Sequence, residues 1–314
     1  MSVQMAVIAA LLGARGKNTE SVESIEARVK RERVEAPPTA ELLRLAKVTR
    51  STVGGFTVLR VVPTAAVAST WPHASTSPHA SGAPQDLHLI YLHGGAYTSP
   101  IINPHWGLIA DLVRRTGASV TVPLYGLAPE HTYLDAYDLI DSVYAGITAE
   151  QVWLVGDSAG GALAVGEAMR IRDSGARAPD GLVLFSPWVD ATMSNSEIAR
   201  LLPRDPMLGA VGLAVAGGWW AGDDDPRNPL VSPLYGNLAG LPPMHIYQGG
   251  RDILAADAKL FAQKVNAVGG EADLQFYPGA IHVWVGLPWL PESRRALSDV
   301  AAVITGMPRG ARNR

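Results

Sequence analysis

The chain has 314 residues, of which 47% are hydrophobic and 18% are charged, and its formal net charge is −3. This composition is that of a globular protein with a large core, and it argues against disorder. No surplus of basic residues is available to neutralise phosphates, so nucleic acid is not an expected partner. The absence of cysteine excludes disulfides, thiolate metal sites and a cysteine nucleophile, and it fits a reducing cytoplasm.

The chain begins with an apolar stretch inside Met1–Leu12 that is too short to cross a membrane. It also lacks the basic start and the cleavage site of a signal peptide. We therefore expect an amphipathic helix packed on the domain, and a cytoplasmic protein without stable membrane insertion. Residues 15–46 predict two further helices, which Pro37 and Pro38 interrupt.

From residue 56 onward, short β-rich apolar runs alternate with longer helical stretches, as in parallel strands joined by helices. The sequence therefore predicts an α/β fold with a mainly parallel, twisted sheet and helices on both faces. The expected strands are Phe56–Val62, Leu87–Leu92, Ser119–Pro123, Val152–Val155, Leu182–Phe185, Met244–Gln248 and Asp273–Tyr277. The expected helices are Trp106–Thr116, Leu134–Ile147, Gly161–Asp173, Leu254–Val268 and Glu292–Ile304.

Two segments depart from the alternation. Residues 64–85 are rich in Ala, Ser, Thr, Pro and His and predict a surface loop. Residues 191–228 interrupt the strand and helix pattern with prolines and a Gly/Ala-rich helical run. We expect a single domain over 1–314, with a cap formed by 1–46 and 191–228 above the carboxyl edge of the sheet.

The strongest chemical signal is the G-x-S-x-G pattern Gly156-Asp157-Ser158-Ala159-Gly160, placed directly between an expected strand and an expected helix. A serine hydroxyl needs a base to take its proton and a tight turn that presents it to substrate. The two glycines avoid collisions across such a turn, and the helix N-terminus favours developing negative charge. The pattern predicts Ser158 as a nucleophile.

A second turn, His93-Gly94-Gly95-Ala96, follows the expected strand Leu87–Leu92. Acyl transfer passes through a tetrahedral oxyanion, which backbone N–H groups stabilise. A glycine pair lets the main chain approach that oxygen closely. We expect the amides of Gly94, Gly95 and Ala159 to form the oxyanion hole.

The base and its orienting acid should follow the serine in the order acid, then histidine. His282 is the only histidine that lies after Ser158 on a loop, just past the last expected strand. The acid should lie on the loop after the penultimate strand, where Asp252 stands. Asp257 is the rival, but it falls inside a helical stretch, where it is expected to be solvated. Asp252 would fix the tautomer of His282, which takes the proton of Ser158.

At these residues the sequence resembles the hormone-sensitive-lipase-like carboxylesterases of bacteria. The matching motifs are His93–Ala96, Tyr125–Glu130, Gly156–Gly161, Ser186–Asp190, Asp252–Leu254 and His282. A weaker similarity to monoterpene lactone hydrolases lies in Asp225–Leu230, Ser232–Tyr235 and His282–Trp284. The resemblance implies an α/β-hydrolase fold, short-chain ester or lactone substrates, no cofactor or metal, a helical N-terminal cap and, in many members, a homodimer.

Two positions depart from the family pattern. Ala96 replaces the third glycine of H-G-G-G, which places a methyl group beside the oxyanion turn and excludes bulky acyl groups. Gly126 replaces the arginine of Y-R-L-A-P-E, which removes an expected ion pair.

The aromatic residues Tyr97, Trp219, Trp220 and Trp284 are candidates for lining the substrate pocket, with Trp289 as a further one. The sequence shows no paired cationic site, so charged acids and phosphate esters are not expected substrates. Two alternatives stay open. The same triad could cleave amides, or the scaffold could be a non-catalytic small-molecule receptor, like the plant gibberellin receptors.

Overall fold

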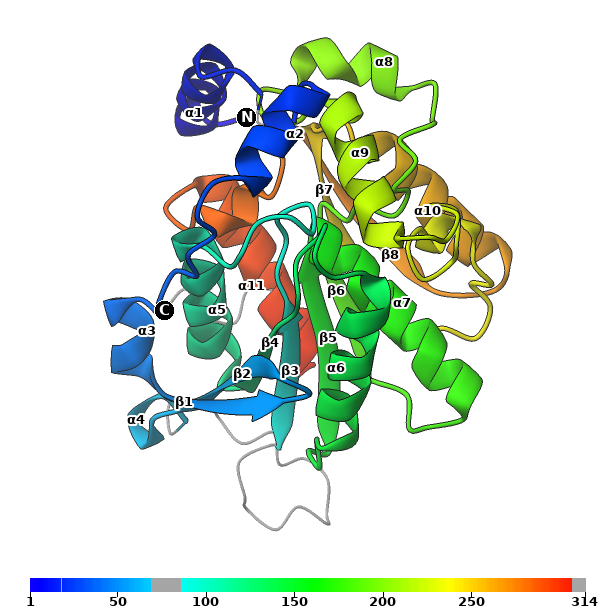
Figure 1. Ribbon diagram of the computed structural model, residues 1–314. Coiled ribbons are helices and arrows are strands. Elements are labelled where there is room, and N and C mark those ends of the chain that lie inside the picture. The colour runs from blue at the N-terminus through cyan, green and yellow to red at the C-terminus, as the bar shows by residue number, and fades with distance from the viewer. Residues whose placement is uncertain (18, 69–85, 307–314) are drawn as a thin grey trace.

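The structure is a computed structural model that describes residues 1–17, 19–68 and 86–306. Its centre is a twisted sheet of eight strands in the order β1-β2-β4-β3-β5-β6-β7-β8 (Figure 1). Strand β2 is antiparallel to both of its neighbours, β1 and β4, and strands β3 to β8 pair in parallel. The strands are β1 (Ala46–Val53), β2 (Phe56–Pro63), β3 (Leu87–Leu92), β4 (Ser119–Leu124), β5 (Gln151–Asp157), β6 (Gly181–Phe185), β7 (Met244–Arg251) and β8 (Ala272–Ile281).

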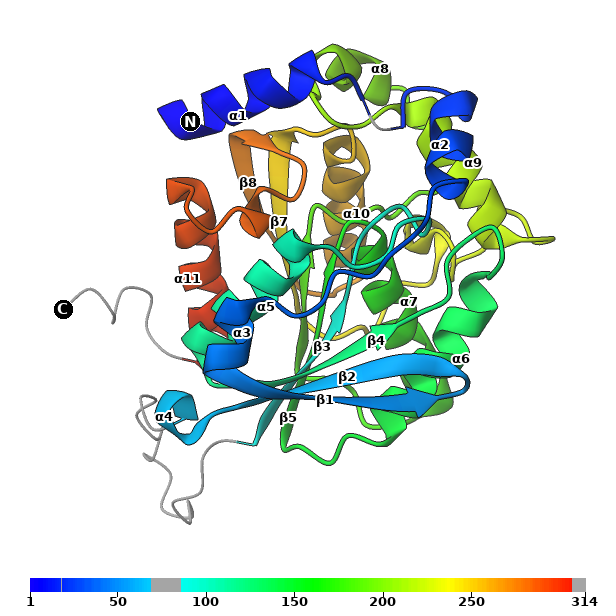
Figure 2. The same ribbon diagram turned by 60° about the vertical axis from the view of Figure 1, so that its left-hand side comes forward.

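Helices cover both faces of this sheet and bury a separate apolar core on each (Figure 2). One face carries α6 (Tyr133–Ala145), α7 (Ala159–Ser174) and α10 (Ala255–Ala267). The other carries α3 (Ala40–Leu45), α5 (Asn103–Thr116) and α11 (Pro291–Thr305). The predicted α/β fold is confirmed, because the seven expected strands and five expected helices occur with small shifts of their ends.

The sequence analysis missed strand β1, which pairs with β2 at the edge of the sheet. Most of its residues are exposed, so it lacks the alternation of apolar and polar positions that marks a half-buried strand. Gly54 and Gly55, both with positive φ, form the two-residue turn between Val53 and Phe56. Two consecutive residues with positive φ are typical of the tight hairpin turns that match strand twist.

The expected loop 64–85 is only partly described. Its first residues form a short helix, α4 (Ala65–Ala68), directly after β2. The loop prediction is wrong for this turn of helix, and residues 69–85 lie outside the described part of the chain.

The N-terminal segment and the 191–228 segment lie together above the carboxyl ends of the parallel strands (Figures 1 and 2). They contain α1 (Val3–Ala14), α2 (Val22–Val29), α8 (Ile198–Leu201), the 3-10 turn η1 (Leu202–Arg204) and α9 (Ala210–Ala221). Thr19 joins the two segments, because its hydroxyl donates to the carbonyl of Gly209 at 2.9 Å and its own carbonyl accepts from Gly212 at 3.0 Å. Side chains at these glycines would collide with the Thr19 backbone, so close packing here requires glycine.

Two further 3-10 turns, η2 (Pro233–Tyr235) and η3 (Trp284–Gly286), complete the elements. Across residues 1–17, 19–68 and 86–306, we find no helix with both the length and the apolar character needed to cross a bilayer.

Candidate active site

Ser158 stands on a sharp turn between the end of β5 and the start of α7. Its backbone has φ 53° and ψ −120°, a conformation that L-residues rarely adopt and that costs about 1–3 kcal/mol. A Cβ at Gly156 would strike the carbonyl of Gly160, and one at Gly160 would strike the carbonyl of Leu92. The two glycines of the pattern therefore permit the turn that lifts the hydroxyl out of the sheet edge.

The structure brings together the three side chains that the sequence predicts as a triad. His282 Nε2 lies 3.0 Å from Ser158 Oγ, and His282 Nδ1 lies 2.8 Å from Asp252 Oδ2. All three residues are buried, although they are far apart in the sequence. The imidazole can therefore accept the serine proton at Nε2 while its Nδ1–H donates to the carboxylate.

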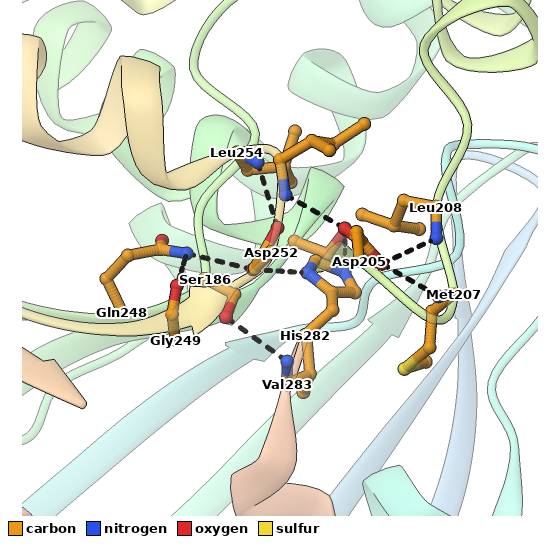
Figure 3. Close-up of polar contacts among 12 residues, drawn as sticks. Ser186, Asp205, Met207, Leu208, Gln248, Gly249, Asp252, Leu254, His282 and Val283 are labelled. Atoms are coloured by element: carbon orange, nitrogen blue, oxygen red, sulfur yellow. Dashed lines mark hydrogen bonds and ion pairs between the residues drawn. The ribbon is translucent and has the colours of Figure 1, made fainter. Parts of the chain in front are cut away.

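Hydrogen bonds from strand β7 and from the loop after it hold the Asp252 carboxylate in place (Figure 3). Oδ2 also accepts from Gln248 Nε2 at 2.9 Å, and Oδ1 accepts from the amide of Leu254 at 2.9 Å. Next to it, Val283 adopts φ 46° and its amide donates to Ser186 Oγ at 3.1 Å, which fixes the loop that carries His282.

The rival acid Asp257 does not contact His282. Its Oδ1 accepts a hydrogen bond from Asn195 Nδ2 at 2.7 Å. The expectation of a solvated residue is wrong, because Asp257 is buried on the inner side of α10, and burial raises its pKa to about 6.

The charge on Asp252 sets the basicity of His282. Burial alone would lower the pKa of this imidazole, since it disfavours the cation. The opposing charge and the hydrogen bond of Asp252 outweigh burial, and the pKa of His282 is raised above its ordinary value.

The oxyanion turn differs from the prediction at one residue. The amide of Gly94 donates to Asp157 Oδ1 at 3.1 Å, so it is already engaged and the prediction that it serves the oxyanion is wrong. Among the described residues, the amides of Gly95, Ala96 and Ala159 have no hydrogen-bond partner. Gly95 and Ala96 have φ of 128° and 53°, and both line the pocket beside Ser158. The free donors are thus displaced by one residue along the turn.

Comparison with known proteins places the chain in a family. Residues 89–286 match a family described by the alpha/beta hydrolase fold. The chain belongs to this family. An esterase of Acinetobacter venetianus is 33% identical to this hydrolase over 229 residues, which cover 70% of this chain and 75% of the relative. An acetyl-hydrolase of Streptomyces hygroscopicus is 33% identical over 222 residues, which cover 69% and 74% of the two chains.

A solved structure shows the same architecture. The crystal structure of an esterase from the bacterial hormone-sensitive lipase family matches with a TM-score of 0.78 and 24% identity, over 98% of this hydrolase and 99% of that chain. At 24% sequence identity, this structural match supports the fold alone. The match over residues 89–286 and the relatives named above confirm the resemblance to esterases of the alpha/beta hydrolase fold.

The Asp157 of this hydrolase supports the oxyanion turn from beneath. Its carboxylate accepts from Tyr91 Oη at 2.5 Å and from the Gly94 amide, and His105 Nε2 lies 3.5 Å from Oδ2. His105 Nδ1 accepts the amide of Ile102, so the proton of its ring is on Nε2. Although burial acts in the opposite direction, these partners hold the pKa of Asp157 below its ordinary value.

A second buried acid, Asp205, lies beside Asp252 and was missed by the sequence analysis (Figure 3). It stands between η1 and α9 and accepts hydrogen bonds from the amides of Met207, Leu208 and Ile253 at 2.7, 2.9 and 2.8 Å. Burial and the negative charge of Asp252 raise its pKa to about 6. The only sequence signal was an aspartate before Pro206 inside the expected cap.

Another arginine forms an ion pair near Gly126, where the family motif has an arginine. Glu130 pairs with Arg33, whose Nη2 lies 2.5 Å from Oε2, and Arg33 also donates to the carbonyl of Ala128 at 2.9 Å. A side chain at Gly126 would collide with the ring of His131. The N-terminal segment therefore supplies the cation that the family motif carries at position 126.

A pocket of about 450 Å³ opens beside Ser158 and His282 in the hydrolase. The predicted aromatic lining is wrong, because none of Tyr97, Trp219, Trp220 and Trp284 borders this pocket. Tyr97 stacks on Trp220 at 4.2 Å in the core, and Trp284 is buried against Tyr277. The lining is mostly apolar and includes these residues: Ile8, Leu11, Leu12, Pro100, Ile102, Leu108, Met207, Leu208, Leu213 and Leu287.

Proposed function

We propose that this hydrolase is a serine carboxylesterase that cleaves short- to medium-chain acyl esters or lactones through an acyl-enzyme. The observation that carries the proposal is the pair of contacts made by His282, to Ser158 at 3.0 Å and to Asp252 at 2.8 Å. Membership in a family whose relatives include an esterase and an acetyl-hydrolase supports ester hydrolysis as the reaction.

In the first half-reaction, Ser158 Oγ attacks the ester carbonyl as its proton passes to His282 Nε2. The carbonyl oxygen becomes an oxyanion, which we assign to the amides of Gly95, Ala96 and Ala159. The N-terminus of α7 adds a favourable electrostatic field at this point. Collapse of the intermediate breaks the ester bond, and the imidazolium returns its proton to the leaving alcohol. In the second half-reaction, water attacks the acyl-enzyme in the same way, with His282 taking its proton, and the acid is released.

The remaining features of the proposal rest on the sequence and on packing. We assign residues 1–29 and 191–228 to a cap, since α1, α2 and residues between η1 and α9 contribute to the pocket wall. The expected cap also included α3, which instead packs against α5 on one face of the sheet. A cytoplasmic homodimer is our working assignment for location and assembly, from the cysteine-free composition and the family resemblance.

The experiment that tests the function compares esters and amides of equal acyl length. With p-nitrophenyl acetate to dodecanoate and with p-nitroanilide counterparts, we expect kcat/KM to peak at acyl chains of about 4–8 carbons, because a pocket of ~450 Å³ encloses a small ligand. Esters should exceed anilides at least about 100-fold, which corresponds to ~2.7 kcal/mol in the barrier. Higher anilide turnover would favour an amidase. Binding of esters without turnover or an acyl-enzyme would favour a receptor.

The pH dependence of kcat/KM tests the role of His282 as base. Neutral imidazole accepts the serine proton, so activity should fall as pH drops through the pKa of His282. Because Asp252 raises this pKa, the midpoint should lie above the ordinary histidine value of about 6.5. In Asp205→Asn the midpoint should move down, since the negative charge of Asp205 also favours the imidazolium. A rate that stays constant down to pH 4 would contradict a histidine base.

A further inference from the structure

The active-site pocket contains cations that the sequence analysis did not anticipate. Arg15, at the end of α1, and Arg28, on α2, both border the pocket that holds Ser158. The two residues come from the N-terminal segment, in which no chemistry is visible from the sequence. The fold therefore places positive charge in a pocket whose remaining lining is mostly apolar.

Arg28 is held in a fixed orientation. Its Nε donates to Ser99 Oγ at 2.6 Å, and Ser99 in turn is tied to the oxyanion turn, because its amide donates to the carbonyl of Gly95 at 3.0 Å. No described residue makes a hydrogen bond to the two terminal nitrogens of the guanidinium, which leaves them to a ligand. These nitrogens form the planar fork that matches the two oxygens of a carboxylate.

The charge of Arg28 is not neutralised by the protein. Within residues 1–17, 19–68 and 86–306, no carboxylate lies within ion-pair distance of Arg28 or Arg15. Arg33 of the same segment pairs with Glu130. Arg31 and Arg44 are also without an ion pair among the described residues, but both are exposed, whereas Arg28 is partly buried in the pocket. Burial lowers the pKa of Arg28, and no acidic group counters this effect. A partly buried, unpaired cation is costly, which points to an anionic group supplied from outside.

The nearest acids of the site are not available to fill this role. Asp157 is occupied by Tyr91, Gly94 and His105, and Asp252 by His282. Neither carboxylate is therefore free to pair with Arg28, which leaves this cation for a group that enters the pocket.

We infer that the preferred substrates are esters that carry a free carboxylate, such as monoesters of dicarboxylic acids, and that Arg28 binds this carboxylate while the ester carbonyl faces Ser158. Arg15, at the exposed rim, adds to the positive potential at the entrance. Water provides the hydroxyl of the newly formed acid and the proton of the released alcohol, so the products are a dicarboxylate and an alcohol. This inference rests on the proposed esterase activity and departs from the expectation that charged acids are not substrates.

The test compares two substrates that differ only in the distal charge: mono-p-nitrophenyl adipate and its methyl-capped diester, methyl p-nitrophenyl adipate. The wild type should show a higher kcat/KM for the monoester, by about 10-fold or more, mainly through KM, as one charge-assisted pair is worth roughly that factor. The preference should shrink with added salt. Monoesters of glutarate and suberate locate the chain length that best reaches Arg28.

Variants then assign the preference to Arg28. Arg28→Met should lose the preference for the monoester, because the partner of its carboxylate is removed. The substitution also removes the hydrogen bond to Ser99, so any loss that is common to both esters reports that contact, and the ratio of the two kcat/KM values reports the carboxylate. Arg28→Lys keeps the positive charge but lacks the two guanidinium nitrogens that bind both carboxylate oxygens, so it should retain part of the preference for the monoester. The matched control is Arg33→Met, which removes a cation from the same segment that is paired with Glu130 and does not border the pocket. Its substrate preference should equal that of the wild type.

The outcomes separate the inference from the proposed function. If the wild type hydrolyses the capped diester but shows no preference for the monoester, the inference is overturned and the esterase proposal stands. If neither ester is hydrolysed, the esterase proposal itself fails. An equal preference in the wild type and in Arg28→Met would also overturn the role of Arg28. Should Arg28→Met not fold, competitive inhibition of the wild type by adipate, with dimethyl adipate as the neutral control, decides the question.

Discussion

Replacing Ser158 by alanine is expected to lower kcat/KM for p-nitrophenyl butyrate by roughly 10⁴-fold or more, because the reaction loses its nucleophile. Within the part of the chain that the structure describes, the side-chain oxygen of Ser158 makes one hydrogen bond, at 3.0 Å to His282 Nε2. Alanine leaves the turn and its glycines unchanged. The unfolding free energy should therefore change by less than about 1 kcal/mol.

The measurement pairs the ester assay with thermal unfolding and with labelling by a sulfonyl fluoride. The wild type should gain one covalent adduct and lose activity, while Ser158→Ala should gain none. Ser142→Ala is the matched control, since Ser142 is an exposed serine on α6 whose hydroxyl bonds only to a backbone carbonyl. It should behave as the wild type in all three assays. Retention of a tenth of the activity by a folded Ser158→Ala protein would move the nucleophile elsewhere.

The site residues that could be predicted from the sequence are those whose position follows from the order of neighbouring strands, turns and helices. Ser158 follows from a strand, a turn with two small glycines, and a helix in direct succession. His282 and Asp252 follow because loops after parallel strands meet at the carboxyl edge of a sheet. The β-rich runs and helical stretches of residues 56–304 were likewise visible, because buried parallel strands are continuous apolar segments.

The parts that the sequence does not reveal depend on contacts between distant segments. Arg28 becomes a pocket residue only because α2 packs beside α9, and nothing in residues 15–46 shows where their side chains point. Asp205 is buried because the segment before α9 folds over Ile253. Aromatic residues were assigned to the pocket by chemistry alone, whereas Tyr97 and Trp220 stack in the core. Edge strand β1 was missed because exposure removes the pattern.

The oxyanion turn lies between these two cases. Its position after β3 was predictable, but the identity of its free amides was not. Asp157 takes the amide of Gly94, and this bond depends on how the strand β5 places its last residue against the turn. The motif therefore predicts where the oxyanion hole lies, whereas the hydrogen bonds of the folded protein determine which backbone amides are free to bind the oxyanion.

Replacing Asp252 by asparagine is expected to reduce kcat by roughly 10³–10⁴-fold while leaving KM within a few-fold. The carboxylate accepts from His282 Nδ1 at 2.8 Å and from Gln248 and Leu254. An asparagine that turns its NH₂ toward the ring would favour the tautomer with the proton on Nε2. That imidazole cannot accept the proton of Ser158, so the loss should appear in the chemical step.

The matched control is Asp257→Asn, at the rival acid five residues further along the same segment. Asp257 is equally buried, but it accepts from Asn195 and not from His282, and burial raises its pKa to about 6. Its kcat should change less than about threefold, as expected of a position outside the reacting groups. A larger loss in Asp257→Asn than in Asp252→Asn would transfer the orienting role to Asp257.

The pH profile distinguishes loss of orientation from simple destabilisation of Asp252→Asn. The charge of Asp252 raises the pKa of His282, so its removal should move the acidic limb of the residual activity to lower pH. A variant that is merely partly unfolded would keep the wild-type midpoint at reduced amplitude. A lower midpoint with a normal melting transition therefore ties the loss of rate to the contact between Asp252 and His282.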